Sequence, residues 1–138
     1  MPTTVPPDVP SEPPPAVAPD PPRPLNAAER AVLELLLSAD FAGAEALRRQ
    51  LDHTEVTGAW FPRSLSVDLR VREPALRAGP MARLAPVGAA VVDEQGEYIG
   101  EFLLWLEDDG LLGALEYAWV TDDMPTELPP VERIELVG

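Results

Sequence analysis

The chain has 138 residues, a formal net charge of −14, no cysteine and no lysine. This charge would repel nucleic-acid phosphates and anionic membranes, so neither is expected to bind, and a basic protein surface is the favoured partner. Without cysteine or lysine there can be no disulfide, thiolate nucleophile, cysteine-bound zinc or Schiff-base lysine. We expect a cytoplasmic protein with no cofactor.

The first 24 residues predict a disordered tail, because eleven of them are proline. Proline fixes φ and removes a backbone donor, so this stretch can form neither a helix nor a central strand. Residues 7–10 match P-x-x-P, so a docking segment stays open beside the favoured reading as a linker. We expect one folded domain over residues 25–138.

Two helices are predicted after the tail. Asn26 and Glu29 have the spacing of a capping box, in which each residue bonds the backbone of the other. Apolar residues then recur at helical spacing, and a second helix is expected over residues 44–51.

Strands are predicted for the remainder. Residues 65–72 alternate strictly between apolar and polar side chains, and Asp109-Gly110 separates two apolar runs as a hairpin turn does. The expected strands cover 56–60, 65–72, 87–92, 98–106, 111–120 and, at an edge, 132–137. The order predicts an α+β fold, with both helices packed on one face of a four- or five-stranded antiparallel meander.

The hairpin of residues 98–120 is apolar on both faces, which predicts central strands covered on both sides. With helices on one face, Leu103, Trp105 and Leu112 would lie exposed on the other. Either residues 122–130 fold over them or they bind a partner, which could be a second copy in a homodimer.

The densest acidic clusters are the candidate partner-binding residues. Asp108 and Asp109 lie in the predicted hairpin turn, and Asp122 and Asp123 follow the second strand. Calcium loops space their ligands at alternating positions, whereas these runs are contiguous, so no metal site is expected. Together with Trp105 and Leu103, they predict an acidic surface for a basic partner.

Glu116 is the best candidate for a ligand site, because it interrupts an apolar strand. Arg70 and Arg72 share one strand face and could grip a carboxylate or phosphate. A cross-strand ion pair with Glu101 or Glu116 is the simpler expectation. His53, the one histidine, lacks a nucleophile in a suitable motif, so no catalytic residue is predicted.

Residues 26–51, 115–119 and 126–129 resemble a family of small actinobacterial α+β proteins of unknown function. The arrangement of helices and acidic sheet is also similar to that of bacterial toxin-immunity proteins. The family resemblance implies a single domain with these limits and brings no known activity, and the likeness to immunity proteins is at the level of the fold.

The leading functional prediction is a non-enzymatic protein-interaction module, in the form of an acidic immunity or antitoxin-like inhibitor. The alternative is a small-ligand-binding protein or minor enzyme with a pocket on the sheet face around Glu116.

Overall fold

The computed structural model describes residues 21–73 and 75–137, which form an α+β fold. The helices are α1 (Ala27–Leu36) and α2 (Ala44–Gln50), with short 3₁₀ turns η1 (Leu51–His53) and η2 (Val131–Arg133). The strands are β1 (Arg23–Pro24), β2 (Thr54–Ala59), β3 (Val67–Val71), β4 (Leu84–Val92), β5 (Tyr98–Leu106), β6 (Leu112–Trp119) and β7 (Ile134–Val137). Residues 1–20 of the predicted tail lie outside the described residues.

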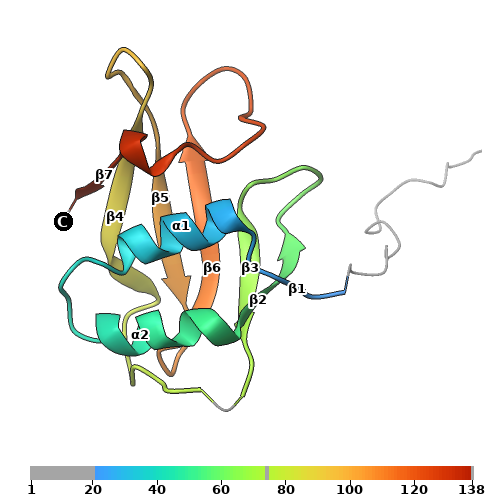
Figure 1. Ribbon diagram of the computed structural model, residues 1–138, viewed down its shortest axis with the longest axis vertical. Coiled ribbons are helices and arrows are strands. Elements are labelled where there is room, and N and C mark those ends of the chain that lie inside the picture. The colour runs from blue at the N-terminus through green and yellow to red at the C-terminus, as the bar shows by residue number, and fades with distance from the viewer. Residues whose placement is uncertain (1–20, 74, 138) are drawn as a thin grey trace, which may run out of the picture.

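All seven strands form one antiparallel sheet in the order β1-β2-β3-β6-β5-β4-β7 (Figure 1). The prediction of four or five strands is wrong, because the sheet has seven: Arg23 and Pro24 add an edge strand that was not expected, and β7 forms the other edge, where a strand was expected over residues 132–137. The single meander is also wrong. Strands β4, β5 and β6 are neighbours in chain order. After β3, however, the chain passes over the positions of β6 and β5 to form β4, so that β6 and not β4 pairs with β3.

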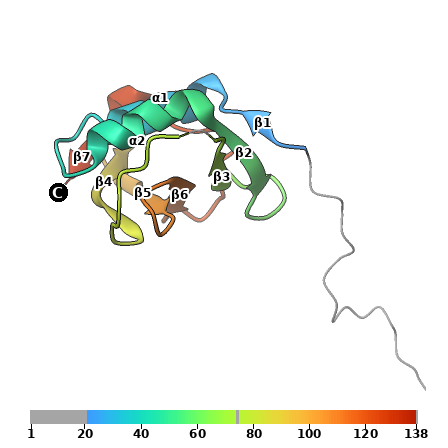
Figure 2. The ribbon, with the colours of Figure 1, turned by 90° about the horizontal axis from the view of Figure 1, so that it is seen from below.

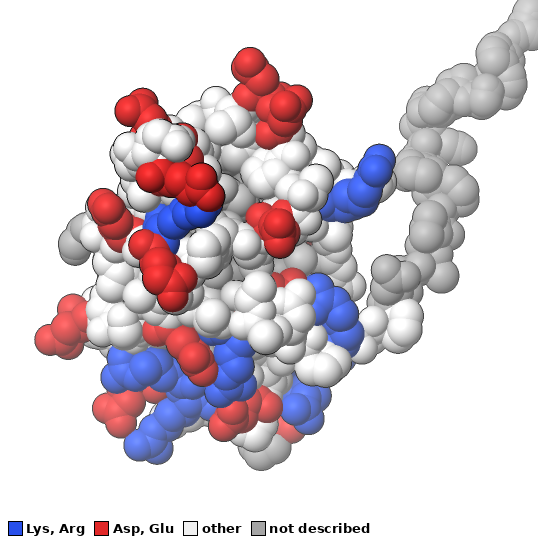
Figure 3. Space-filling model, turned by 45° about the horizontal axis from the view of Figure 1, so that its top comes forward, with Lys and Arg blue, Asp and Glu red and all other residues white. Residues whose placement is uncertain are grey.

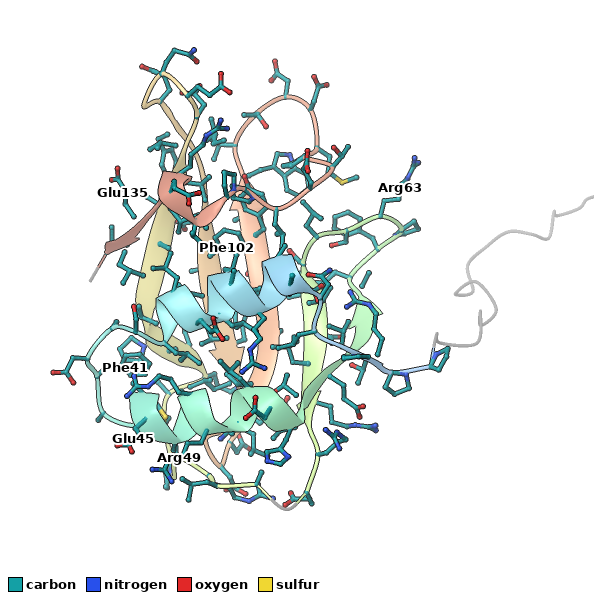
Figure 4. The ribbon with its side chains drawn as sticks, viewed as in Figure 1. Phe41, Glu45, Arg49, Arg63, Phe102 and Glu135 are labelled. Carbon is teal, nitrogen blue, oxygen red and sulfur yellow. The ribbon has the colours of Figure 1, made fainter. Side chains whose placement is uncertain are left out.

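Figure 2 shows a curved sheet with α1 and α2 on the same side of it. Buried residues of both helices, including Val32 and Leu47, belong to the same hydrophobic core as those of the strands. Phe102, which lies behind α1 in Figure 4, is fully buried and stacks on Tyr117 with ring centroids 4.7 Å apart. We call the sheet face that bears Phe102 the inner face and the opposite one the outer face.

A β-bulge at Gly113 decides which side chains of β6 reach each face. Leu106 pairs with Leu112, but Trp105 pairs with Ala114, so Gly113 is an extra residue on β6. Leu112 therefore points to the inner face and is 1% exposed. The expectation that Leu112 would lie exposed with Leu103 and Trp105 is wrong, because simple alternation does not include the bulge.

Gln50 connects α2 to the turn between β5 and β6. Its side chain is fully buried, and its Nε2 donates to the carbonyl oxygens of Leu76 and Gly110, each at 2.8 Å. Its Oε1 accepts from the backbone N–H of Leu112 at 3.0 Å. One amide thus satisfies three backbone groups from two segments, and it holds the hairpin against the helix.

Replacing Gln50 with leucine should destabilise the protein. The change leaves the buried Leu112 N–H without its acceptor and removes the bonds to the carbonyl oxygens of Gly110, which keeps the Ala78 N–H, and of the exposed Leu76. This loss should cost about 2 kcal/mol in the free energy of unfolding. Urea denaturation followed by circular dichroism measures this value. Gln95→Leu, at an exposed turn position, is the matched control and should change stability by less than about 0.5 kcal/mol.

Tyr117 should make stability depend on alkaline pH. Burial raises the pKa of its hydroxyl above the ordinary value of 10.0, so the folded state holds the proton more tightly than the unfolded chain does. The stabilisation is complete below pH 10 and declines as pH rises through the folded pKa. Urea denaturation across this range should show a decline that Tyr117→Phe reduces. If the free energy of unfolding declines as much in Tyr117→Phe as in the unchanged protein, the assignment to Tyr117 is contradicted. The control is Tyr98→Phe, at an exposed position, which should retain most of the decline.

Candidate functional site

The outer face is built from three rows of residues that pair across neighbouring strands. The first row joins β2, β3, β6, β5 and β4 as Gly58, Asp68, Ala114, Trp105 and Leu84. The second joins Glu116, Leu103, Gly88 and Val137, and the third joins Ala118, Glu101, Ala90 and Glu135. Every charged residue in these rows is a carboxylate. Leu84 is 40% exposed and Val137 is 52% exposed, so apolar side chains share this acidic surface.

Neutral aromatic donors hold three of the four carboxylates. Trp60 Nε1 donates to Asp68 Oδ1 at 3.1 Å, and Trp105 Nε1 donates to Glu116 Oε1 at 2.9 Å. The Tyr98 hydroxyl donates to Glu101 Oε1 at 3.2 Å. Indole and phenol groups orient a carboxylate without cancelling its charge. Among the described residues no arginine forms an ion pair with these three carboxylates, so none of the three charges is neutralised by a direct ion pair.

Leu103 and Trp105 lie half-buried on the outer face, where the sequence placed them. The segment after β6 was one candidate for covering them. Three of its residues, Thr126, Glu127 and Leu128, instead line a cavity with the first turn of α1, and Leu128 packs against the core.

The predicted acidic clusters do not form one surface. Asp108 and Asp109 lie in the turn at one end of β6, and Asp122 and Asp123 follow its other end, about 25 Å away for a strand of this length. Arg77 Nη1 lies 3.5 Å from Asp109 Oδ2, so the first cluster is also partly neutralised. On the side seen in Figure 3, the upper end of the molecule carries mostly acidic side chains, whereas at the lower end arginines and acidic side chains are interspersed.

Arg70 and Arg72 contact a different carboxylate from those expected. Arg70 Nη2 lies 2.6 Å from Glu55 on the neighbouring strand β2, and Arg72 Nε lies 4.0 Å from it. The pairing of Asp68 with Ala114 separates Arg70 from Glu116 by four residue steps along antiparallel strands, or about 13 Å. The structure therefore does not bring Glu116 together with either arginine.

The outer face contains a hollow of about 270 Å³ between two tryptophans. Ala114 lies in the middle of the first row, with Asp68 and the indole of Trp60 on one side and Trp105 on the other. Arg83 and Glu107 also line this space, which we call the Trp60–Trp105 hollow. Sequence reasoning missed Trp60 and Asp68. The available signal was the outward position of Asp68 in the alternating strand.

A larger cavity, of about 440 Å³, lies beside the first turn of α1. We call it the α1 cavity. Its polar lining includes Arg23, whose guanidinium donates two bonds to the buried Glu29, at 2.8 and 2.9 Å. These bonds raise the pKa of Arg23 above its usual value. Glu29 also accepts from the Asn26 N–H and completes the predicted capping box. Val56, Leu65 and Val67 supply apolar walls.

Residues 21–73 and 75–137 contain no group of three histidine, aspartate or glutamate side chains placed to hold a metal ion. His53 is exposed at the end of η1. No helix among the described residues is long and apolar enough to span a bilayer.

Comparison with known proteins gives no relative: no family model matches the chain, and neither does any curated protein or solved structure.

The Arg23–Glu29 pair beside the α1 cavity should be a measurable source of stability. Glu29→Ala removes a buried ion pair and one half of the capping box, at a cost of about 2 kcal/mol in unfolding free energy, because the half-exposed arginine can be rehydrated. Thermal and urea denaturation provide the measurement. The control Glu34→Ala removes only an exposed i,i+4 pair with Arg30 and should cost about 0.3 kcal/mol. Equal losses in the two variants would contradict this account.

Proposed function

We propose that the protein is a non-enzymatic interaction module whose outer sheet face binds a basic protein. The observation that carries the proposal is the composition of the three cross-strand rows, which combine small and apolar residues with four carboxylates and contain no basic residue. Protein interfaces combine apolar contact area with complementary charge, and the charge speeds association and selects partners of opposite sign.

The proposal relocates the partner-binding surface within the predicted set of residues. Trp105 and Leu103 remain at its centre because both lie on the outer face. Glu116 joins them as a carboxylate held by Trp105. The clusters Asp108–Asp109 and Asp122–Asp123 lie at the two ends of the hairpin, where they would add to the long-range attraction of a basic partner.

A basic protein is a better occupant than a second copy of this chain. In a two-fold symmetric dimer the same surface patch meets itself, so the carboxylates of both copies would be buried together. Like charges brought together at an interface oppose association. We therefore propose the homodimer only as the alternative occupant.

The form we propose is an immunity or antitoxin-like inhibitor acting in the cytoplasm. A small acidic domain that covers a basic active surface of another protein needs no cofactor or catalytic residues of its own. The net charge of −14 and the uncompensated carboxylates of the outer face support this role.

The second candidate function is small-ligand binding, and the α1 cavity is the observation that favours it. Its volume of about 440 Å³ lies within the usual range of ligand pockets, and its walls are apolar with a few polar groups. This version differs from the pocket expected around Glu116, since that residue does not line the α1 cavity.

Affinity capture with variants tests the interaction. We expect the immobilised protein to recover one basic protein from a lysate of the native host at low salt and to lose it at high salt. Leu103→Arg places a cation on the outer face and should abolish this capture. The control Leu76→Arg makes the same change at an exposed loop position and should leave it intact.

Two results would contradict the proposal: capture that survives Leu103→Arg, or a recovered partner that is acidic and insensitive to salt. Binding of a small molecule that is lost when Leu65→Trp fills the α1 cavity would support the second candidate instead.

A further inference from the structure

We propose that the Trp60–Trp105 hollow receives an arginine side chain of the basic partner. The inference rests on the proposed function and names the chemical group recognised at one point of the outer face. It follows from the shape of the hollow, from the bonds made by its two indoles, and from its charge.

The cross-strand row gives the hollow its shape. Ala114 pairs with Asp68 on one side and with Trp105 on the other, so its small side chain forms a floor between larger neighbours. Two strand spacings separate Asp68 from Trp105, about 10 Å. The volume of about 270 Å³ is smaller than most pockets for drug-sized ligands, and a single side chain is the size of group that it can take.

Both indoles have their N–H group engaged. Trp60 donates to Asp68 and Trp105 donates to Glu116, so the surface that these rings offer to an entering group is the aromatic carbon system. Aromatic faces attract cations, and the attraction is strongest for tryptophan. Trp60 is 42% exposed and can still lose contact with water when a partner binds.

The charge around the hollow favours a cation as well. Asp68 and Glu107 line the hollow, and Glu116 lies next to it, where it accepts the hydrogen bond from the Trp105 indole. Arg83 is a positive group at the same place, which leaves a net charge of −2 for these four residues. Arg83 makes no ion pair within the described part of the chain and is exposed, so it can turn away from an entering cation.

A guanidinium fits this setting better than an ammonium. It is planar, so it can stack on an indole while its N–H groups donate in the ring plane to a carboxylate such as Asp68. A lysine ammonium is a compact and strongly hydrated charge. It cannot stack on an indole as a plane, so it should bind less tightly between a ring and a carboxylate.

The three tryptophans of the chain allow a direct test. Each gives one indole N–H signal in a proton–nitrogen correlation spectrum, and Trp60→Phe and Trp105→Phe assign them. Trp119 is the internal reference, because it pairs with Gly100 and contacts Phe61 rather than the hollow. The full chain is titrated with a blocked tripeptide containing one arginine, and separately with the same peptide containing citrulline or lysine.

We expect the arginine peptide to shift the Trp60 and Trp105 signals in a saturable way while Trp119 stays in place. Citrulline, which has the same shape without the charge, should give no saturable shift, and lysine should bind several-fold more weakly. Asp68→Asn and Ala114→Val should each weaken arginine binding about tenfold. The matched control Glu97→Gln, at an exposed turn, should leave it unchanged. An unmoved Trp119 signal in each variant shows that the fold is intact.

Three results would overturn the inference: equal shifts with citrulline, equal affinity for lysine, or binding unaffected by both Asp68→Asn and Ala114→Val. The capture experiment separates this failure from failure of the proposed function. If Leu103→Arg abolishes capture while Asp68→Asn does not weaken it, the outer face binds the partner without an arginine in the hollow. If capture does not depend on Leu103, the proposed function itself fails.

Discussion

The buried amide of Gln50 is the interaction on which the arrangement of helix and hairpin depends. It bonds Leu76, Gly110 and Leu112, which come from two segments that are distant from α2 in sequence. The bonds to Gly110 and Leu112 are buried, so without the amide the Leu112 N–H would lose its acceptor and the Gly110 carbonyl oxygen would keep only the Ala78 N–H. Apolar packing alone would hold α2 near the sheet, but it has no direction. The three bonds fix where the β5–β6 turn lies, and hence where β6 begins.

The start of β6 in turn determines the outer face. Because the bulge at Gly113 lets Leu112 and Leu115 both face the core, Ala114, Glu116 and Ala118 all point outward. If the register of a strand shifts by one residue, each of its side chains moves to the opposite face of the sheet. A Cβ at position 113 would lie only 3.1 Å from Glu107 Oε2 and 3.2 Å from the carbonyl oxygen of Trp105, so glycine suits this site. The candidate binding surface is therefore a consequence of how the turn is fixed.

The elements with strong local patterns could be predicted from the sequence, and the long-range pairings could not. The capping box of Asn26, the alternating strand β3 and the Asp-Gly turn all depend on residues close together in the chain, and each is present. The return of β6 to β3 depends on contacts between distant segments, for which alternation gives no signal. Arg70 consequently pairs with Glu55, and not with Glu101 or Glu116.

The candidate site could be predicted in part for the same reason. Leu103 and Trp105 follow from alternation within β5, whereas Asp68 reaches the same hollow through the pairing of β3 with β6. Trp60 could not be assigned to it without knowing that the chain turns back at residues 60–66 to place its indole on Asp68. A site made by three strands is recognisable from sequence only when their order is known.

The distribution of arginine explains how this surface keeps its charge. Arg23, Arg30 and Arg49 pair with carboxylates of the helices, and Arg70 pairs with Glu55 of β2. Tryptophan and tyrosine instead hold Asp68, Glu116 and Glu101. An arginine at these positions would orient the same carboxylates, but it would also neutralise them and occupy the place of an incoming cation. Neutral donors leave the carboxylates both oriented and charged. The carboxylates therefore repel one another on this face, and a partner of opposite charge would reduce that repulsion.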